Sequence, residues 1–185
     1  MDDPKLQELC RTIYNRHHEA IDYLYEQSHI TSAEIIGIID EWCREREKAG
    51  ESFFSEAPRN NTYTRFTTPA VRRCLAPMEK ANSTWNSRDI AYYEICHRED
   101  SISLVFIAGF DHLDESRRAA LEKLMQLVDR KNRKDDQHGI RLKNFGTHKI
   151  NGEAESKENK KKITEYLNKY WKEIKKFEAE VLAQI

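Results

Sequence analysis

A carboxylate at position 94 has the strongest claim to chemistry in this 185-residue chain. Glu94 stands in an aromatic run, YYEIC, where a carboxylate held in a pocket could act as an acid or a base. It could instead accept hydrogen bonds from the backbone or from an arginine such as Arg65, and we favour this role because structural ion pairs also explain such residues. The residues expected to line a pocket are Arg65, Trp85, Tyr92 and Glu94.

Other candidate pairs have spacings that suit neither catalysis nor metal binding. Cys96 and His97 are adjacent in a predicted strand, so their side chains point to opposite faces and are badly placed for a thiolate–imidazole pair. His17 and His18 lie about 100° apart around a predicted helix and cannot share one metal ion. Residues 111–114 (DHLD) could touch a cation, but a helix cap and a turn explain them better. Since there is also no glycine-rich phosphate loop, we expect no cofactor and no metal.

Positive charge is concentrated between residues 131 and 149, which could contact nucleic acid or another anion. The basic residues concerned are Lys131, Arg133, Lys134, Arg141, Lys143 and Lys149. Phosphate contacts need little more than such a patch. However, acidic residues such as Asp135 and Asp136 interleave with the basic ones, so a solvated surface of mixed sign is the favoured interpretation.

The composition sets limits on partners and compartment. Charged residues make up 34% of the chain, yet the formal net charge is −1, so no global field attracts nucleic acid or an anionic membrane. There is no apolar run of about 18 residues and no signal-peptide pattern, so we expect a cytoplasmic protein without membrane contact. Four widely spaced cysteines without a CxxC motif suggest reduced thiols rather than disulfides or a zinc site.

A predicted β-hairpin over residues 84–110 organises the rest of the chain. Side chains alternate over residues 90–97, and the charged residues 98–100 form the turn. The return strand is apolar on both faces, with Phe106 on one and Val105 on the other, which favours a central place in a sheet.

The segments on either side of the hairpin complete an α+β domain. Strands are predicted at 63–67 and 140–150, and helices begin after the caps Thr68 and Asp114. The order is strand, helix, strand, strand, helix, strand, which is ferredoxin-like and uses the two helices as crossovers between parallel strands. A clean apolar stripe predicts one more long helix from Ser156.

Two further helices precede this domain. The second begins at a capping box formed by Thr31 and Glu34, and its short connection to the first predicts an antiparallel helical hairpin. Mixed charge on the second helix argues against a DNA-reading helix-turn-helix. The predicted organisation is an N-terminal hairpin at 1–50, a polar linker at 51–62 and an α+β domain at 63–185.

Three phrases carry a family resemblance: RFTTPAV at 65–71, NSTWNSRDIAYYEI at 82–95 and KKFEAEVL at 175–182. In this order they resemble the C-terminal part of bacterial and prophage proteins in the PD-(D/E)XK nuclease superfamily. The resemblance extends over residues 60–185 and implies an accessory domain of the kind that follows the nuclease core in longer relatives. The usual company of that family implies a role in phage–host conflict.

The nuclease core itself is missing from this resemblance. Its signature needs an acidic residue and, on an adjacent strand, Glu/Asp-x-Lys, which together hold magnesium and activate water. The chain contains Glu155-Ser-Lys157 at a predicted helix start and Glu173-Ile-Lys175 inside a helix. Neither stands on a strand, so we expect solvated helix surface rather than a metal site.

Three functional hypotheses follow. The first is a non-catalytic interaction module that binds a protein partner or recruits nucleic acid. The second is a small metal-dependent nuclease, or another nucleic-acid enzyme, with a degenerate site. The third is a homo-oligomeric structural or regulatory protein that assembles through the apolar stripe of its N-terminal helices.

Overall fold

The chain forms an α+β fold with one antiparallel sheet and helices at both ends, as seen in a computed structural model. The structure describes residues 4–28, 30–54, 62–81, 87–98, 100–110, 112–128, 134–135, 139–151 and 156–185. The helices are α1 (Pro4–Ser28), α2 (Ser32–Lys48), α3 (Pro69–Cys74), α4 (Glu115–Leu127) and α5 (Ser156–Glu180), followed by a 3₁₀ turn, η2 (Leu182–Gln184). The strands are β1 (Phe53–Phe54), β2 (Tyr63–Thr67), β3 (Ala91–Arg98), β4 (Ser101–Gly109), β5 (Lys134–Asp135) and β6 (Gly139–Lys149).

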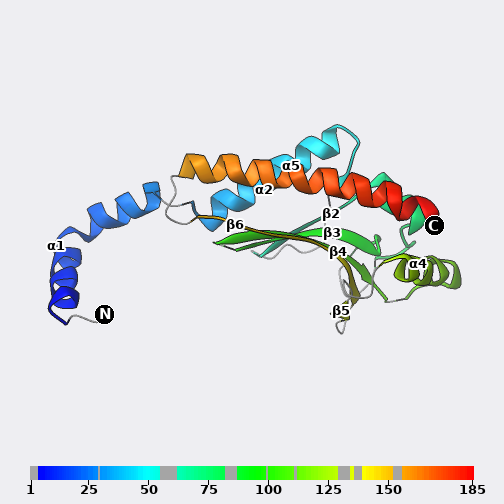
Figure 1. Ribbon diagram of the computed structural model, residues 1–185, viewed down its shortest axis with the longest axis horizontal. Helices are drawn as coiled ribbons and strands as arrows, with labels where there is room; N and C mark the ends of the chain where they lie inside the picture. The colour runs from blue at the N-terminus through cyan, green and yellow to red at the C-terminus, as the bar shows by residue number, and fades with distance from the viewer. Residues whose placement is uncertain are drawn as a thin grey trace.

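The sheet has the strand order β1-β2-β3-β4-β6-β5, and each neighbouring pair is antiparallel (Figure 1). β3 and β4 form the predicted hairpin, with Arg98 opposite Ser101 beside the turn. β4 lies between β3 and β6, which confirms its predicted central position. Phe106 and Val105, which point to opposite faces, are both buried, as expected for a strand that is apolar on both sides.

The ferredoxin-like arrangement predicted for residues 63–150 is corrected by this order. That arrangement needs parallel neighbours, whereas β2, β3, β4 and β6 follow one another across the sheet in chain order and pair antiparallel. The reason lies in the helices. α3 spans only six residues, and α3 and α4 lie near one end of the sheet rather than across its face (Figure 1). The face that crossover helices would cover is occupied by α2 and α5 instead.

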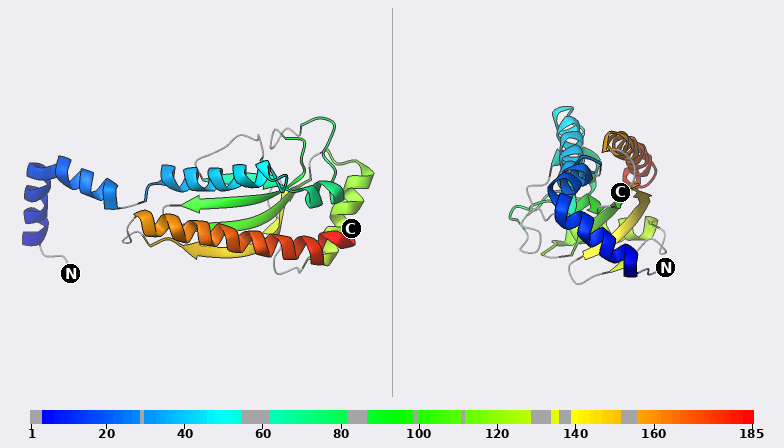
Figure 2. Two further views of the ribbon diagram at one scale, coloured as in Figure 1. Left: turned by 90° about the horizontal axis from the view of Figure 1, so that it is seen from above. Right: turned by 90° about the vertical axis from the view of Figure 1, so that its left-hand side faces the viewer.

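α2 and α5 lie side by side over one face of the sheet (Figures 1 and 2). Aromatic side chains form the core on this face. On this face Phe66, Tyr93 and Phe106 stand opposite one another on three neighbouring strands. The Trp42 ring of α2 lies 5.9 Å from Phe66, and the Phe177 ring of α5 lies 5.5 Å from Phe106, centre to centre. Both helices are therefore anchored on the same aromatic row.

A cation between two indoles joins α2 to α5. The guanidinium of Arg46 lies 4.9 Å from the centre of the Trp42 ring and 5.1 Å from that of Trp171. The Oδ1 atom of Asn168 accepts hydrogen bonds from Trp42 Nε1 at 3.1 Å and from Arg46 at 3.0 Å. The capping box of Thr31 and Glu34 forms as predicted at the start of α2. α2 is thus part of the core of the α+β domain.

The predicted antiparallel hairpin of the first two helices is not formed. α1 projects away from the body while α2 lies on the sheet (Figures 1 and 2). α1 is kinked at His17, whose φ of −132° is not helical. The apolar stripe that predicted a hairpin therefore stays uncovered. Part of the predicted linker, in contrast, joins the sheet, because Phe53 and Phe54 form β1 beside β2.

Candidate functional site

The sheet face opposite α2 and α5 carries five of the predicted site residues, Arg65, Tyr92, Glu94, Arg141 and Lys149, and among the described helices none lies on it (Figure 1). We call it the helix-free face. Strand register arranges its side chains in four rows: Arg98, Ser101 and Lys149; Tyr63, Cys96, Ser103 and Thr147; Arg65, Glu94, Val105 and Asn144; and Tyr92, Ile107 and Arg141. Each row crosses three or four strands of a rigid sheet, so these side chains have fixed neighbours.

Glu94 is paired with Arg65, the cation that the sequence analysis proposed for it. Arg65 Nε donates to Glu94 Oε2 at 2.7 Å, and both side chains are only 12% exposed. The guanidinium also lies 4.3 Å from the centre of the Tyr63 ring. A short, largely desolvated bond of this kind holds the carboxylate in one orientation.

The Cys96 thiol shares the same carboxylate. Its Sγ atom donates to Glu94 Oε1 at 3.4 Å. Burial, together with the negative charge of Glu94, raises the pKa of this thiol to about 11. The thiolate, which is the nucleophilic form, is therefore scarce at neutral pH. His97 next to it is buried and stands opposite Ile102, on the other face of the sheet, as the alternation of a strand requires.

The predicted basic patch is divided by the sheet. Arg141 and Lys149 belong to the helix-free face. Lys143 stands opposite Phe106, on the face covered by α5, and lines a cleft there with Phe145 and Phe177. Irregular register within β6, with Gly146 at a φ of 107°, breaks the simple alternation of this strand. Lys131, Arg133 and Trp85 lie outside the described residues, and of Lys134 only the backbone is described, in β5.

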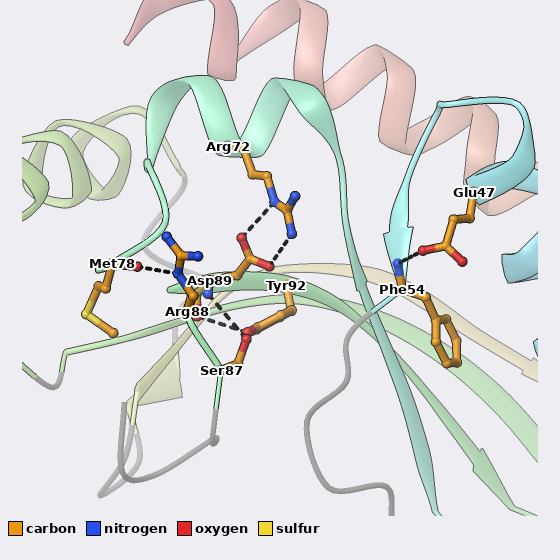
Figure 3. Close-up of polar contacts among 8 residues, drawn as sticks. All are labelled: Glu47, Phe54, Arg72, Met78, Ser87, Arg88, Asp89 and Tyr92. Atoms are coloured by element: carbon orange, nitrogen blue, oxygen red, sulfur yellow. Dashed lines mark hydrogen bonds and ion pairs between the residues drawn. The ribbon is translucent and has the colours of Figure 1, made fainter. Parts of the chain in front are cut away.

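Tyr92 contributes to structure rather than to a pocket beside Glu94. It is fully buried, and its hydroxyl donates to the backbone oxygen of Asp89 at 2.9 Å. Figure 3 shows that Asp89 is also held by Arg72 of α3, whose Nε and terminal nitrogen each donate to one carboxylate oxygen at 2.8 Å. The Arg72 guanidinium lies 3.7 Å over the Phe53 ring of β1. One arginine thus ties α3, β1 and the start of β3 together.

A buried acid on α5 was missed by the sequence analysis. Glu178 is 7% exposed. Its Oε1 accepts from the hydroxyl of Thr68 at 2.5 Å and from that of Tyr93 at 3.4 Å, and Lys175 lies 3.3 Å from Oε2. Glu178 follows Ile174 by four residues and so falls on the buried stripe of the helix. An acidic residue within an otherwise apolar helix stripe is the sequence signal that could have predicted this buried carboxylate.

The Glu/Asp-x-Lys patterns do not form a site in the described residues. Glu173 and Lys175 lie on α5, where Lys175 contacts Glu178 and the Trp171 ring. Lys157 is exposed on α5, and Glu155 lies outside the described residues. Across the described ranges, no group of three or more His, Cys, Asp or Glu side chains is arranged to hold a metal ion. No described helix is long and apolar enough to cross a membrane.

Comparison of the chain with protein-family models, with curated proteins and with solved structures finds no match.

Proposed function

We propose that this protein is a non-catalytic interaction module that presents the helix-free face of its sheet to a partner. One observation carries the proposal, namely that the reactive groups of that face satisfy one another. Glu94 accepts from Arg65 and from Cys96, whose thiol stays protonated because its pKa is about 11. A charge-paired carboxylate and a protonated thiol are poor acid–base and nucleophilic groups. They hold the middle of the face rigid, so that its more exposed side chains keep fixed positions.

The partner that we favour is a protein. Half-buried tyrosine, arginine and isoleucine side chains on one rigid face, here Tyr63, Arg65 and Ile107, are the types enriched or common at the centre of protein interfaces. Exposed Arg98 and Lys149 stand at one end of the face and would form a polar rim. The resemblance to the region that follows PD-(D/E)XK cores supports a role beside nucleases in phage–host conflict.

A charge-reversal pair tests this proposal. We expect Arg98→Glu with Lys149→Glu to abolish capture of the partner from an extract of the organism that encodes the chain. The matched control reverses two exposed lysines on α5, Lys157→Glu with Lys172→Glu, and should capture the partner normally. Calorimetry with the purified partner then measures the loss directly. Equal capture by both variants would refute a contact through the helix-free face.

A nucleic-acid partner is the second candidate, and a specific arrangement favours it. Arg98, Arg141 and Lys149 lie on the helix-free face, while Glu94 on that face is already paired with Arg65. Titration of a labelled oligonucleotide at several salt concentrations tests this candidate. Each phosphate-binding cation replaced by alanine should reduce the salt dependence of the binding constant by about one unit of slope. Binding that does not respond to salt would exclude phosphate contacts.

The nuclease hypothesis makes a different prediction. If the chain is non-catalytic, neither Mg²⁺ nor Mn²⁺ will support cleavage of DNA or RNA by the purified protein. Metal-dependent cleavage that disappears in Glu155→Ala or Glu94→Gln would establish the rival hypothesis instead.

A further inference from the structure

α1 presents apolar side chains to solvent along its described length. From Lys5 to Leu24 each residue is exposed except Ile21, which is half-buried. The large apolar residues and their exposed fractions are Leu6 57%, Leu9 55%, Ile13 46%, Tyr14 46%, Tyr23 62% and Leu24 64%. Figure 1 and the left view of Figure 2 show the helix reaching away from the body. Side chains of this size lower the free energy of the chain only when they are removed from water.

The kink makes a partner more necessary. It divides α1 at His17 into two arms, and Tyr14 and Asp22 meet across it, since the Tyr14 hydroxyl donates to Asp22 Oδ1 at 3.0 Å. Neither arm, 4–16 or 18–28, exceeds the length of about 12–15 residues below which an isolated helix is marginal in water. Packing of an apolar face usually supplies the missing stability. For α1 that packing has to come from outside the body of its own chain.

The charges of the two arms indicate which partner this is. The first arm carries Lys5, Arg11 and Arg16 against one acid, Glu8. The part of the second arm whose side chains are described, residues 18–24, carries two acids and no lysine or arginine. The helix macrodipole would favour the opposite distribution, with acids near the N-terminus and bases near the C-terminus. The helix alone therefore does not explain this polarity.

We propose that α1 pairs antiparallel with α1 of a second copy of this chain. In that arrangement the basic arm of each copy lies beside the acidic arm of the other, and a two-fold axis near His17 makes both contacts at once. With the axis at residue 17, each residue of one copy lies opposite the residue of the other copy that is equally far from position 17 on the other side. Ile13 of one copy therefore lies beside Ile21 of the other, and Arg16 lies close to Glu19. A parallel pair would bring like charges together, and an anionic membrane would repel the acidic arm.

The oligomeric state of the 185-residue chain tests the pairing. Sedimentation over a range of concentrations should show a monomer–dimer equilibrium for the wild type. Leu9→Gln with Ile13→Gln should raise the dissociation constant at least about a hundredfold, since two apolar side chains per copy lose their burial. Glu8→Gln with Asn15→Gln changes the opposite side of the same arm and should leave the dimer intact. A wild type that stays monomeric at high concentration overturns the proposal and leaves α1 to a different partner.

Two charge variants test the antiparallel direction and control for folding. Arg16→Glu and Glu19→Arg each place like charges at the contact near the axis, so each alone should associate roughly tenfold more weakly than the wild type. Mixed in equal amounts they should form heterodimers as tight as the wild-type dimer, because opposite charges then meet again. Recovery on mixing also shows that both variants are folded. Association of either variant alone at wild-type strength would overturn the proposal.

Cross-linking at the native Cys10 gives an independent readout. Cys10 is exposed, and in the antiparallel pair it faces Leu24 of the other copy while the two Cys10 residues stay far apart. Under mild oxidation Leu24→Cys should therefore form cross-linked dimers at least about ten times faster than the wild type. Rapid cross-linking of the wild type through Cys10 would establish a parallel pair and overturn the antiparallel one.

Discussion

The buried carboxylate of Glu178 gives a prediction whose size follows from its contacts. Its Oε1 accepts from the hydroxyls of Thr68 and Tyr93, and the first of these bonds is 2.5 Å long. Tyr93 and Thr68 are both fully buried. Burial, together with the nearby negative charge of Glu178, raises the pKa of Tyr93 well above its usual value. In Glu178→Ala both hydroxyls lose this acceptor.

The expected loss is large for a single residue. An unsatisfied buried donor costs about 1–3 kcal/mol, so two of them should lower the free energy of unfolding by about 3 kcal/mol in Glu178→Ala. For a chain of this length that corresponds to a fall in Tm of roughly 6–12 °C. Glu178→Gln keeps an oxygen in place for both hydroxyls and loses only the charge beside Lys175, whose side chain is 45% exposed. It should therefore cost less than about 1 kcal/mol.

Urea denaturation followed by circular dichroism measures both variants, with linear extrapolation to zero denaturant. A double-mutant cycle of Glu178→Ala with Thr68→Ala should give a coupling energy of about 1.5–3 kcal/mol, the range for a hydrogen bond to a charged group. The reasoning is refuted if alanine and glutamine destabilise equally, or if the coupling energy is zero.

Three further predictions concern other parts of the fold. Burial and the positive charge of Lys169 lower the pKa of His148, whose ring stacks on that of Tyr166 in α5 at 4.2 Å, centre to centre. As the pH falls, the unfolded chain therefore takes up a proton before the folded one does. The free energy of unfolding should therefore drop as the pH falls through about 6.5, the ordinary pKa of histidine. The drop should be smaller in His148→Phe, and urea midpoints at pH 7.5 and 5.5 measure it. Equal shifts of the midpoint in both proteins would contradict this. Asp89→Asn should cost about 2 kcal/mol because Arg72 loses a charged bidentate partner, and an unchanged midpoint would argue against that pairing. Iodoacetamide at pH 8 should modify the exposed Cys10 well before Cys96, whose pKa of about 11 keeps its thiol protonated, and mass spectrometry measures both products. Faster labelling of Cys96 would contradict the burial of that thiol.

Local features of the fold could be predicted because they depend on neighbours in the sequence. Strict alternation over residues 90–97 and the turn at 98–100 gave β3, β4 and their pairing. The caps at Thr31, Thr68 and Asp114 are each formed, since a cap needs only a side chain and a backbone group within four residues. Burial of β4 on both faces likewise followed from its composition.

Features that depend on distant segments could not be predicted in the same way. An apolar stripe indicates that a helix buries one side but not what covers it, so α1 and α2 were paired with each other although α2 packs on the sheet with α5. Strand order was assigned from the succession of elements, which is shared by folds with parallel and with antiparallel neighbours. β1 has only two residues, too few to show a periodicity.

The candidate site could be predicted only in part, again because some of its contacts depend on distant segments. The pairing of Glu94 with Arg65 could be anticipated only as a type of contact, because a carboxylate within an apolar strand needs a partner such as an arginine; the predicted ferredoxin-like order does not make their two strands neighbours. The basic residues were taken as one patch, but a shift in the register of β6 assigns Arg141 and Lys143 to opposite faces. Such a shift has no signature in the residues themselves.

The two-residue outer strands, β1 and β5, affect how copies of the chain can assemble. A long, unpaired outer strand can recruit the same strand of another molecule, and repetition of that step gives fibres. Here β5 pairs with only Ile140 and Arg141, so the rest of β6, up to Lys149, has no partner strand on its outer side among the described residues. The register shifts of β6 and its lysines, Lys143 and Lys149, disfavour growth by strand addition along this edge, whereas association through α1 would stop at a closed pair.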